Sequence, residues 1–155
     1  METYNSNNIE ELVVWGAKYE IGVPIIDKQH QELVGIINEL YRSCRTNGSE
    51  EVNAAFKDAM RRIVGYVRFH FSAEQELLER LQFPHFKNHI RQHEVFVRDI
   101  FDAARDFRDG KRFAPHVFVR TLRDWVLGHI AVSDKQFAQY FTEQKKMGSN
   151  IDFLK

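Results

Sequence analysis

Two pairs of potential metal ligands lie near the middle of this sequence, each with the spacing of one helical turn. His70 and Glu74 form the first pair, and His89 and His93 form the second. An α-helix advances about 100° per residue, so residues four positions apart return to one face, about 6 Å further along the axis. Each pair can therefore direct both side chains at one ion. A proline between the pairs predicts a turn that joins two antiparallel helices.

Three further candidate ligands bring the set to five imidazoles and two carboxylates. They are His30 and His129, each on an otherwise apolar helix face, and Asp134. One ion rarely takes seven protein ligands, but two ions that share both carboxylates as bridges use all of them. With a bridging hydroxide, the ion with three histidines is six-coordinate, and its neighbour with two histidines is five-coordinate. The remaining open position predicts a site for a small ligand.

The spacing of His129 and Asp134 does not suit a regular helix. Five residues rotate by about 500°, which leaves Asp134 about 140° away from His129. Both can face one centre only if the backbone departs from α-helical geometry. We therefore expect a widened turn or a helix end within Ile130–Ser133, an irregularity that is frequent at functional sites.

Each of these motifs has a simpler explanation when it is taken alone. A His-x-x-x-Glu pair is usually a surface salt bridge, and a single histidine on an apolar face is usually a hydrogen-bonded core residue. Their combination favours metal binding, because imidazoles buried on four apolar faces are costly unless they are paired or metallated. His85 and His116 lie at predicted helix starts, outside the pattern, and are assigned no role.

The ligands must be positioned by helices, which the apolar periodicity predicts throughout the chain. The expected helices span 24–46, 50–82 and 85–109, followed by a fourth from Pro115 and a short one over 134–144. Four long amphipathic segments with short links predict an all-α fold, an up-down-up-down antiparallel four-helix bundle. An irregular N-terminal arm and the short C-terminal helix flank the bundle.

Turn residues and apolar rows supply the expected details of these helices. Asn47-Gly48 should end the first helix, Ser49 should cap the second, and Gly110 should end the third. The expected inner face of the third helix is formed by Val97, Ile100, Phe101, Ala104 and Phe107.

Composition excludes several classes of protein. The 155 residues carry 22 basic and 22 acidic side chains, and this balance argues against a nucleic-acid partner. Cys44 is the only cysteine, so neither an intramolecular disulfide nor a thiolate metal cluster can form. The sequence has no secretory signal and no apolar run of membrane-spanning length. We expect a soluble, cytoplasmic protein without a membrane partner.

Four segments of the chain resemble one known family. They are Ile26-Asp-Lys-Gln-His30, His70-Phe-Ser-Ala-Glu74, His89-x-x-x-His93 and Trp125-Val-Leu-Gly-His129-Ile-Ala-Val-Ser-Asp134. In order and spacing they resemble single-domain bacterial hemerythrins, the non-haem di-iron oxygen-binding four-helix bundles. The resemblance covers a domain of residues 15–142, with extensions at 1–14 and 143–155. Leu78 and Gln75 depart from the residues that many family members carry there.

The resemblance implies an oxo- or hydroxo-bridged pair of iron ions. The implied ligands of the saturated iron are His89, His93 and His129. The iron with the open position would be bound by His30 and His70, and Glu74 and Asp134 would be the bridges. The residues implied to line the oxygen pocket are Leu33, Phe71, Trp125, Val126 and Ile130.

The function that this resemblance implies is reversible O2 binding, with O2 held as a hydroperoxide on the five-coordinate iron. The protein would then be an oxygen carrier, store or scavenger rather than an enzyme, and NO, azide or other small anions are alternative ligands of the same site. No protein acid or base is evident beside the open position, so no catalytic residue is predicted. A di-iron peroxidase, a nitric-oxide-reducing enzyme and an oxygen sensor stay open as alternatives, and the sequence identifies no protein partner.

Overall fold

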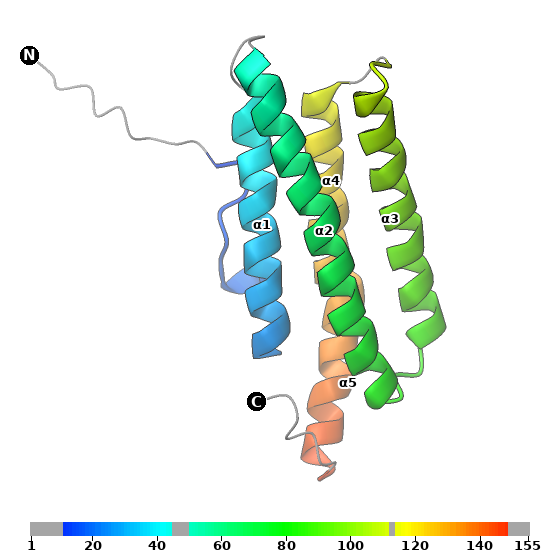
Figure 1. Cartoon of the computed structure of the whole chain (residues 1–155). Coiled ribbons are helices and arrows are strands. Elements are labelled where there is room, and N and C mark those ends of the chain that lie inside the picture. The colour runs from blue at the N-terminus through cyan, green and yellow to red at the C-terminus, as the bar shows by residue number, and fades with distance from the viewer. Residues whose placement is uncertain (1–10, 45–49, 112–113, 149–155) are drawn as a thin grey trace, which may run out of the picture.

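The computed structural model describes residues 11–44, 50–111 and 114–148, and it is an antiparallel four-helix bundle (Figure 1). The elements are a short 3₁₀ turn, η1 (Ala17–Tyr19), then α1 (Pro24–Cys44), α2 (Glu50–Arg80), α3 (Phe86–Arg108), α4 (Pro115–His129), a π-helical turn η2 (Ile130–Asp134) and α5 (Lys135–Lys146). The described residues contain no strand. The predicted fold class is therefore confirmed. No helix within these three ranges has the length and hydropathy needed to cross a membrane.

The predicted helix limits lie within two residues of those observed. The main difference is at the end of the chain, where the short C-terminal helix is not separated from α4 by a loop. The residues at the junctions between these elements all have right-handed helical backbone angles: His129, Ile130, Asp134 and Lys135. The elements α4, η2 and α5 therefore form one continuous helix. The turn predicted at 47–48 and the cap predicted at 49 lie outside the described residues.

A left-handed residue ends α2 before the proline that follows it. Gln82 has a φ of 52°, and its N–H donates to the carbonyl of Glu79 at 3.0 Å. The next N–H, that of Phe83, donates to the carbonyl of Leu78 at 3.0 Å. This pattern is a Schellman motif, which satisfies the last carbonyls of the helix. It also places Phe83 and Leu78 in one apolar cluster, and so fixes the direction in which α3 begins.

The end of α3 uses the same motif around a glycine. Gly110 has a φ of 68° and donates to the carbonyl of Phe107 at 3.3 Å, while Lys111 donates to that of Asp106 at 3.0 Å. A glycine takes this left-handed geometry without strain. The prediction that Gly110 ends the third helix is confirmed.

Side-chain hydrogen bonds tie the N-terminal arm to α1. The Asn38 side chain accepts from the N–H of Val13 at 3.0 Å and donates to the Val13 carbonyl at 2.8 Å. Further along, the Asp27 carboxylate accepts from the N–H groups of Ile21 at 2.7 Å and Gly22 at 3.0 Å. The arm therefore runs beside α1 for the length of these contacts (Figure 1).

The apolar core is divided into two clusters with the candidate ligands between them. The larger cluster includes Leu33 of α1 and Phe71 of α2, and the smaller one includes Ile26 and Leu77 of the same helices. His30 lies between the two clusters along α1, as Glu74 does along α2. The bundle thus has a polar layer enclosed at both ends by apolar side chains.

On α3, one residue of the predicted inner face is wrong. Phe101 was expected on the inner face of α3, but its side chain is 42% exposed, whereas Phe96, absent from the predicted row, is 5% exposed. Phe96 and Ile100 are four residues apart and share the buried face, and Phe101 lies about 100° around the helix from Ile100. The ring of Phe101 lies instead beneath the guanidinium of Arg68, 5.6 Å from its centroid.

Candidate metal centre

The seven candidate ligands meet in the polar layer as two groups that share both carboxylates. All seven side chains are buried, and within each group the donor atoms lie within 4.8 Å of one another. One group contains His30, His70, Glu74 and Asp134, and the other contains Glu74, His89, His93, His129 and Asp134. His85 and His116, to which no role was assigned, are exposed.

The group formed by α1 and α2 contributes one imidazole from each helix. His30 Nε2 lies 3.1 Å from Asp134 Oδ2, and His70 Nε2 lies 3.3 Å from Glu74 Oε2. Two donor atoms that each bind an ion at about 2.1 Å, at right angles to one another, are about 3.0 Å apart. These spacings therefore suit neighbouring positions around one ion.

The group formed by α3 and α4 contributes three imidazoles. His89 Nε2 lies 2.9 Å from Glu74 Oε1 and 3.3 Å from Asp134 Oδ1. His129 Nε2 lies 3.1 Å from Asp134 Oδ1 and 2.9 Å from His93 Nε2. His93 Nε2 is 3.7 Å from Glu74 Oε2. All five candidate imidazoles of the layer thus direct Nε2 toward the two carboxylates.

The π-helical turn brings Asp134 to the same side of the helix as His129. The N–H of Lys135 donates to the carbonyl of Ile130, which is five residues earlier rather than four. Such a turn contains an extra residue and so changes the rotation between its two ends. The predicted irregularity within Ile130–Ser133 is confirmed. Asp134 is fully buried as a result, with 0% of its surface exposed.

Many polar atoms of this layer have no hydrogen-bond partner in the described protein. They include both carboxylate oxygens of Glu74 and of Asp134, together with both ring nitrogens of His30. A polar group buried without a partner costs several kcal/mol, so nearly all such groups are satisfied by protein, water or ions. Imidazole nitrogens and carboxylate oxygens are donors that suit iron and other first-row transition metals. The residues present therefore fit a pair of metal ions.

Two glutamines that the sequence interpretation overlooked orient imidazoles of the layer. Gln29 of α1 accepts a hydrogen bond from His70 Nδ1 at 2.8 Å, and Gln92 of α3 accepts one from His129 Nδ1 at 3.0 Å. Gln92 also accepts from the Ser133 hydroxyl at 2.7 Å. Each glutamine directly precedes a candidate ligand of its own helix and serves a ligand of the next helix. That adjacency is the sequence signal that could have identified them.

These hydrogen bonds determine which ring nitrogen carries the hydrogen and which one presents a lone pair to the carboxylates. A neutral imidazole carries one N–H, so a ring that donates through Nδ1 has an unprotonated Nε2. In His70 and His129 this Nε2 lone pair then faces a carboxylate oxygen, an arrangement that is repulsive unless a cation lies between them. Such outer partners are typical of metal-binding histidines, because they fix the tautomer and the ring orientation.

Burial and neighbouring charges shift the pKa values of this layer in opposite directions. Burial alone raises the pKa of Asp134, but contacts with His129, His30 and His89 outweigh it and hold that pKa well below its usual range. Burial likewise lowers the pKa of His89, but contacts with Asp134 and Glu74 outweigh it and raise the pKa to about 9. For His93, burial and the neighbouring imidazoles together lower the pKa to about 2. The layer thus favours a positive charge beside the carboxylates and excludes one at His93.

The residues expected to form the oxygen pocket lie on the side of the larger apolar cluster. The four that are buried are members of that cluster: Leu33, Phe71, Val126 and Ile130. Trp125 is half-buried and packs against it, with its ring stacked 3.7 Å from Phe96 and 4.7 Å from His129. This side of the metal layer is therefore lined by apolar side chains.

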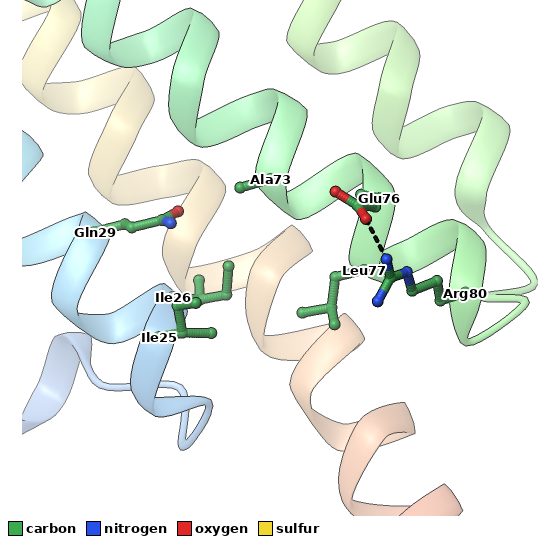
Figure 2. A pocket seen from close by; sticks show the side chains of 7 residues that line it. All are labelled: Ile25, Ile26, Gln29, Ala73, Glu76, Leu77 and Arg80. Carbon is green, nitrogen blue, oxygen red and sulfur yellow. Dashed lines mark hydrogen bonds and ion pairs between the residues drawn. The ribbon is translucent and has the colours of Figure 1, made fainter. Parts of the chain in front are cut away.

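On the α1–α2 side, a small surface pocket reaches Gln29. Its volume is about 160 Å³, and Figure 2 shows Gln29 and Ile26 on α1 opposite Ala73 and Leu77 on α2. An ion pair between Glu76 and Arg80 lies at its edge. This pocket therefore brings solvent close to the glutamine that orients His70.

Comparison with known proteins assigns the family. Residues 21–141 match the family model of the hemerythrin HHE cation binding domain. The bacteriohemerythrin of Stenotrophomonas maltophilia is 28% identical over 127 residues, covering 82% of this chain and 80% of that protein. That of Methylococcus capsulatus is 26% identical over 127 residues, covering 81% of this chain and 94% of that protein. The solved structure of wild-type hemerythrin has the same fold, with a TM-score of 0.76 and 23% identity over 83% of this chain and 96% of that chain. This chain belongs to the hemerythrin family.

Proposed function

We propose that the buried layer binds two iron ions and that the protein uses them to bind O2 reversibly. The observation that carries this proposal is the pair of shared carboxylates between groups with unequal numbers of imidazoles. Membership of the hemerythrin family and the similarity to two bacteriohemerythrins support the same function.

In this proposal Glu74 and Asp134, which belong to both donor groups, would be shared by the two ions. His89, His93 and His129 hold one ion, and the other is held by His30 and His70. The ion with one imidazole fewer has an open position for a small ligand. A pair of ferrous ions held by these residues would supply the two electrons that reversible O2 binding requires.

The role of the surrounding side chains is to keep water and proton donors away from the open position. Leu33, Phe71, Val126 and Ile130 are at most 5% exposed. None of these side chains titrates, so this wall supplies no acid or base for further reduction of O2. The proposal is therefore a carrier, store or scavenger of O2 that also admits NO or azide, and not an enzyme. The bundle of residues 15–142 contains all seven ligands, and the extensions 1–14 and 143–155 contain none of them.

The test is an absorption spectrum of the full chain recorded under nitrogen, in air and again under nitrogen. We expect near-ultraviolet and visible charge-transfer bands that appear in air and disappear when O2 is removed. His30→Gln should abolish the bands because it removes a ligand, whereas His116→Gln, an exposed imidazole outside the layer, should leave them unchanged. Bands that form once and never reverse would contradict reversible binding and favour an enzyme or a sensor. Absence of the bands in iron-loaded protein would contradict the proposal altogether.

A further inference from the structure

A second, larger pocket lies between α2 and α3, on the opposite side of α2 from the pocket in Figure 2. Its volume is about 350 Å³, and one part of its wall is His93, a candidate ligand. The proposed function uses His93 through Nε2 and Phe71 as an apolar wall, and does not use the other residues of this pocket. The pocket therefore connects the protein surface to the back of one candidate ligand.

The wall of this pocket carries a small positive charge. Arg68 of α2 and Arg98 of α3 contribute two guanidinium groups, and Glu94 contributes one carboxylate. Arg98 also lies 3.5 Å from Asp99, but these side chains are 67% and 65% exposed, so this pair is screened by water and weak. Guanidinium groups bind carboxylates with matched pairs of hydrogen bonds. Two guanidinium groups and one carboxylate leave the wall with one net positive charge, which neutralises a ligand with one anionic group better than a ligand with two.

The rest of the wall combines uncharged polar groups with apolar ones. Ser72 and Gln75, one turn of α2 apart, offer a hydroxyl and an amide, while Phe71 and Val97 offer apolar surface. Phe71 stacks on the His93 ring with the centroids 3.7 Å apart and the planes parallel. A ligand with an anionic head and a short apolar body matches this division of the wall.

His93 also lacks an outer hydrogen-bond partner that two other candidate ligands have. Its Nδ1 is buried and has no partner in the described protein, whereas Nδ1 of His70 and of His129 each donate to a glutamine. If Nε2 of His93 binds an ion, as the proposed function requires, Nδ1 keeps its hydrogen and needs an acceptor. An anionic oxygen in the adjoining pocket is such an acceptor.

We propose that the α2–α3 pocket binds a small organic monocarboxylate, held by Arg68 and Arg98, with its apolar body against Phe71 and Val97. Its head group serves as the outer hydrogen-bond acceptor of His93. The hydrogen bond from His93 to the ligand rests on the proposed function. The charge and the shape of the pocket are independent of that function. The site is distinct from the open position beside His30 and His70, and its occupant acts on the metal pair through one ligand.

The first test is calorimetric titration of the full chain, as purified with its metal, with benzoate as the probe. We expect one benzoate per chain, with the same affinity when azide saturates the metal centre, because the two sites are separate. Displacement of benzoate by azide would place benzoate on the metal and overturn the proposal. The absence of heat at millimolar benzoate would also overturn it and would leave water as the occupant. If the purified chain holds no iron, the proposed function fails, but the titration still measures the pocket.

Variants then locate the site. Arg68→Gln and Arg98→Gln should each weaken benzoate binding about tenfold or more, as expected for the loss of a charged hydrogen bond. Arg91→Gln removes the same charge from an exposed position of α3 outside the pocket, and should leave the affinity unchanged. Equal affinities in all three variants would overturn the assignment. Benzoate should also slow metal release to a chelator in the unmodified chain and lose that effect in Arg68→Gln, since a stronger acceptor at Nδ1 makes His93 a better ligand.

Discussion

The metal layer and the larger apolar cluster beside it are equally buried, but different interactions stabilise them. In the cluster, side chains such as Ile37 and Ile63 are 0% exposed and pack among other apolar side chains. In the layer, Glu74 and Asp134 are also 0% exposed, and their oxygens have no hydrogen-bond partner in the described protein. The cluster is therefore stabilised by apolar packing, whereas the unpartnered oxygens of the layer suit bound cations. Burial of a histidine or a carboxylate indicates a site only when its polar atoms are examined as well.

The largest expected effect comes from removing a shared carboxylate. Glu74→Gln keeps the size of the side chain but removes an anionic oxygen that both groups of ligands share, so binding should weaken at both ions. We expect metal content to fall from two ions per chain to one or none, measured by elemental analysis. Glu76→Gln removes the same charge two residues away, where the side chain is 63% exposed, and should retain two ions. Full metal content in Glu74→Gln would contradict the bridging role.

A variant of the apolar cluster should affect stability without any dependence on metal. Ile63→Ala leaves a cavity in the core and should lower the free energy of unfolding by about 2–5 kcal/mol. Because Ile63 lies about two turns of α2 before His70, the loss should be the same with and without bound metal, as measured by chemical denaturation of both forms. Val132→Ala is the control, since Val132 is 70% exposed and should change stability by about 0.5 kcal/mol or less. A loss that appears only in the metal-bound form would show that the two regions are coupled.

Removing an outer hydrogen bond should weaken the layer without dismantling it. Gln92→Leu deprives His129 of the acceptor that fixes its tautomer, and should reduce metal affinity about 10- to 100-fold. Gln29→Leu should act in the same way through His70. Competition with a metal chelator measures both affinities, and Gln31→Leu, an exposed position of α1, serves as the control. Unchanged affinity in both buried variants would exclude the orienting role.

The most gradual effect, spread over several pH units, is the pH dependence of the chain without metal. Below pH 6.5 the unfolded chain protonates His93, whereas the folded chain does not do so until its pKa of about 2 is reached, so stability falls as the pH falls through this range. The raised pKa of His89, about 9, stabilises the fold below pH 6.5, and this contribution is lost as the pH rises to about 9. Each slope is at most about 1.4 kcal/mol per pH unit. Urea denaturation of metal-free protein should show maximum stability near pH 6.5, and His93→Gln should lose the fall in stability just below that pH. At lower pH the depressed pKa of Asp134 still lowers the stability of this variant. A flat profile would contradict both shifts.

The sequence predicted the bundle and the meeting of the seven side chains because both depend on local spacing. The i, i+4 pairs require only helical geometry, and the mismatch between His129 and Asp134 was sufficient to predict a widened turn or a helix end where the π-helical turn lies. Contacts between helices were harder to predict from the sequence. Gln29 and Gln92 looked like ordinary polar helix residues, because their importance depends on which imidazole of the neighbouring helix they meet.

The sequence also could not predict which residues at the edge of a helix face are buried. Periodicity places Phe101 near the inner face of α3, but the rotation of α3 against its neighbours decides between Phe101 and Phe96. The same limit applies to the N-terminal arm, where the pairing of Val13 with Asn38 joins residues 25 positions apart that no local pattern connects. The local periodicity of apolar residues thus predicts the helices. The way the helices pack against one another determines which residues hydrogen-bond to the candidate ligands.

The most direct test of this account is the iron content of the full chain, measured by elemental analysis after expression with iron supplied. The shared carboxylates and the five imidazoles predict two irons per chain, and their loss from Glu74→Gln but not from Glu76→Gln. One iron per chain would contradict the bridged pair. No iron in correctly folded protein would contradict the metal centre itself and would leave the buried carboxylates of Glu74 and Asp134 without an explanation.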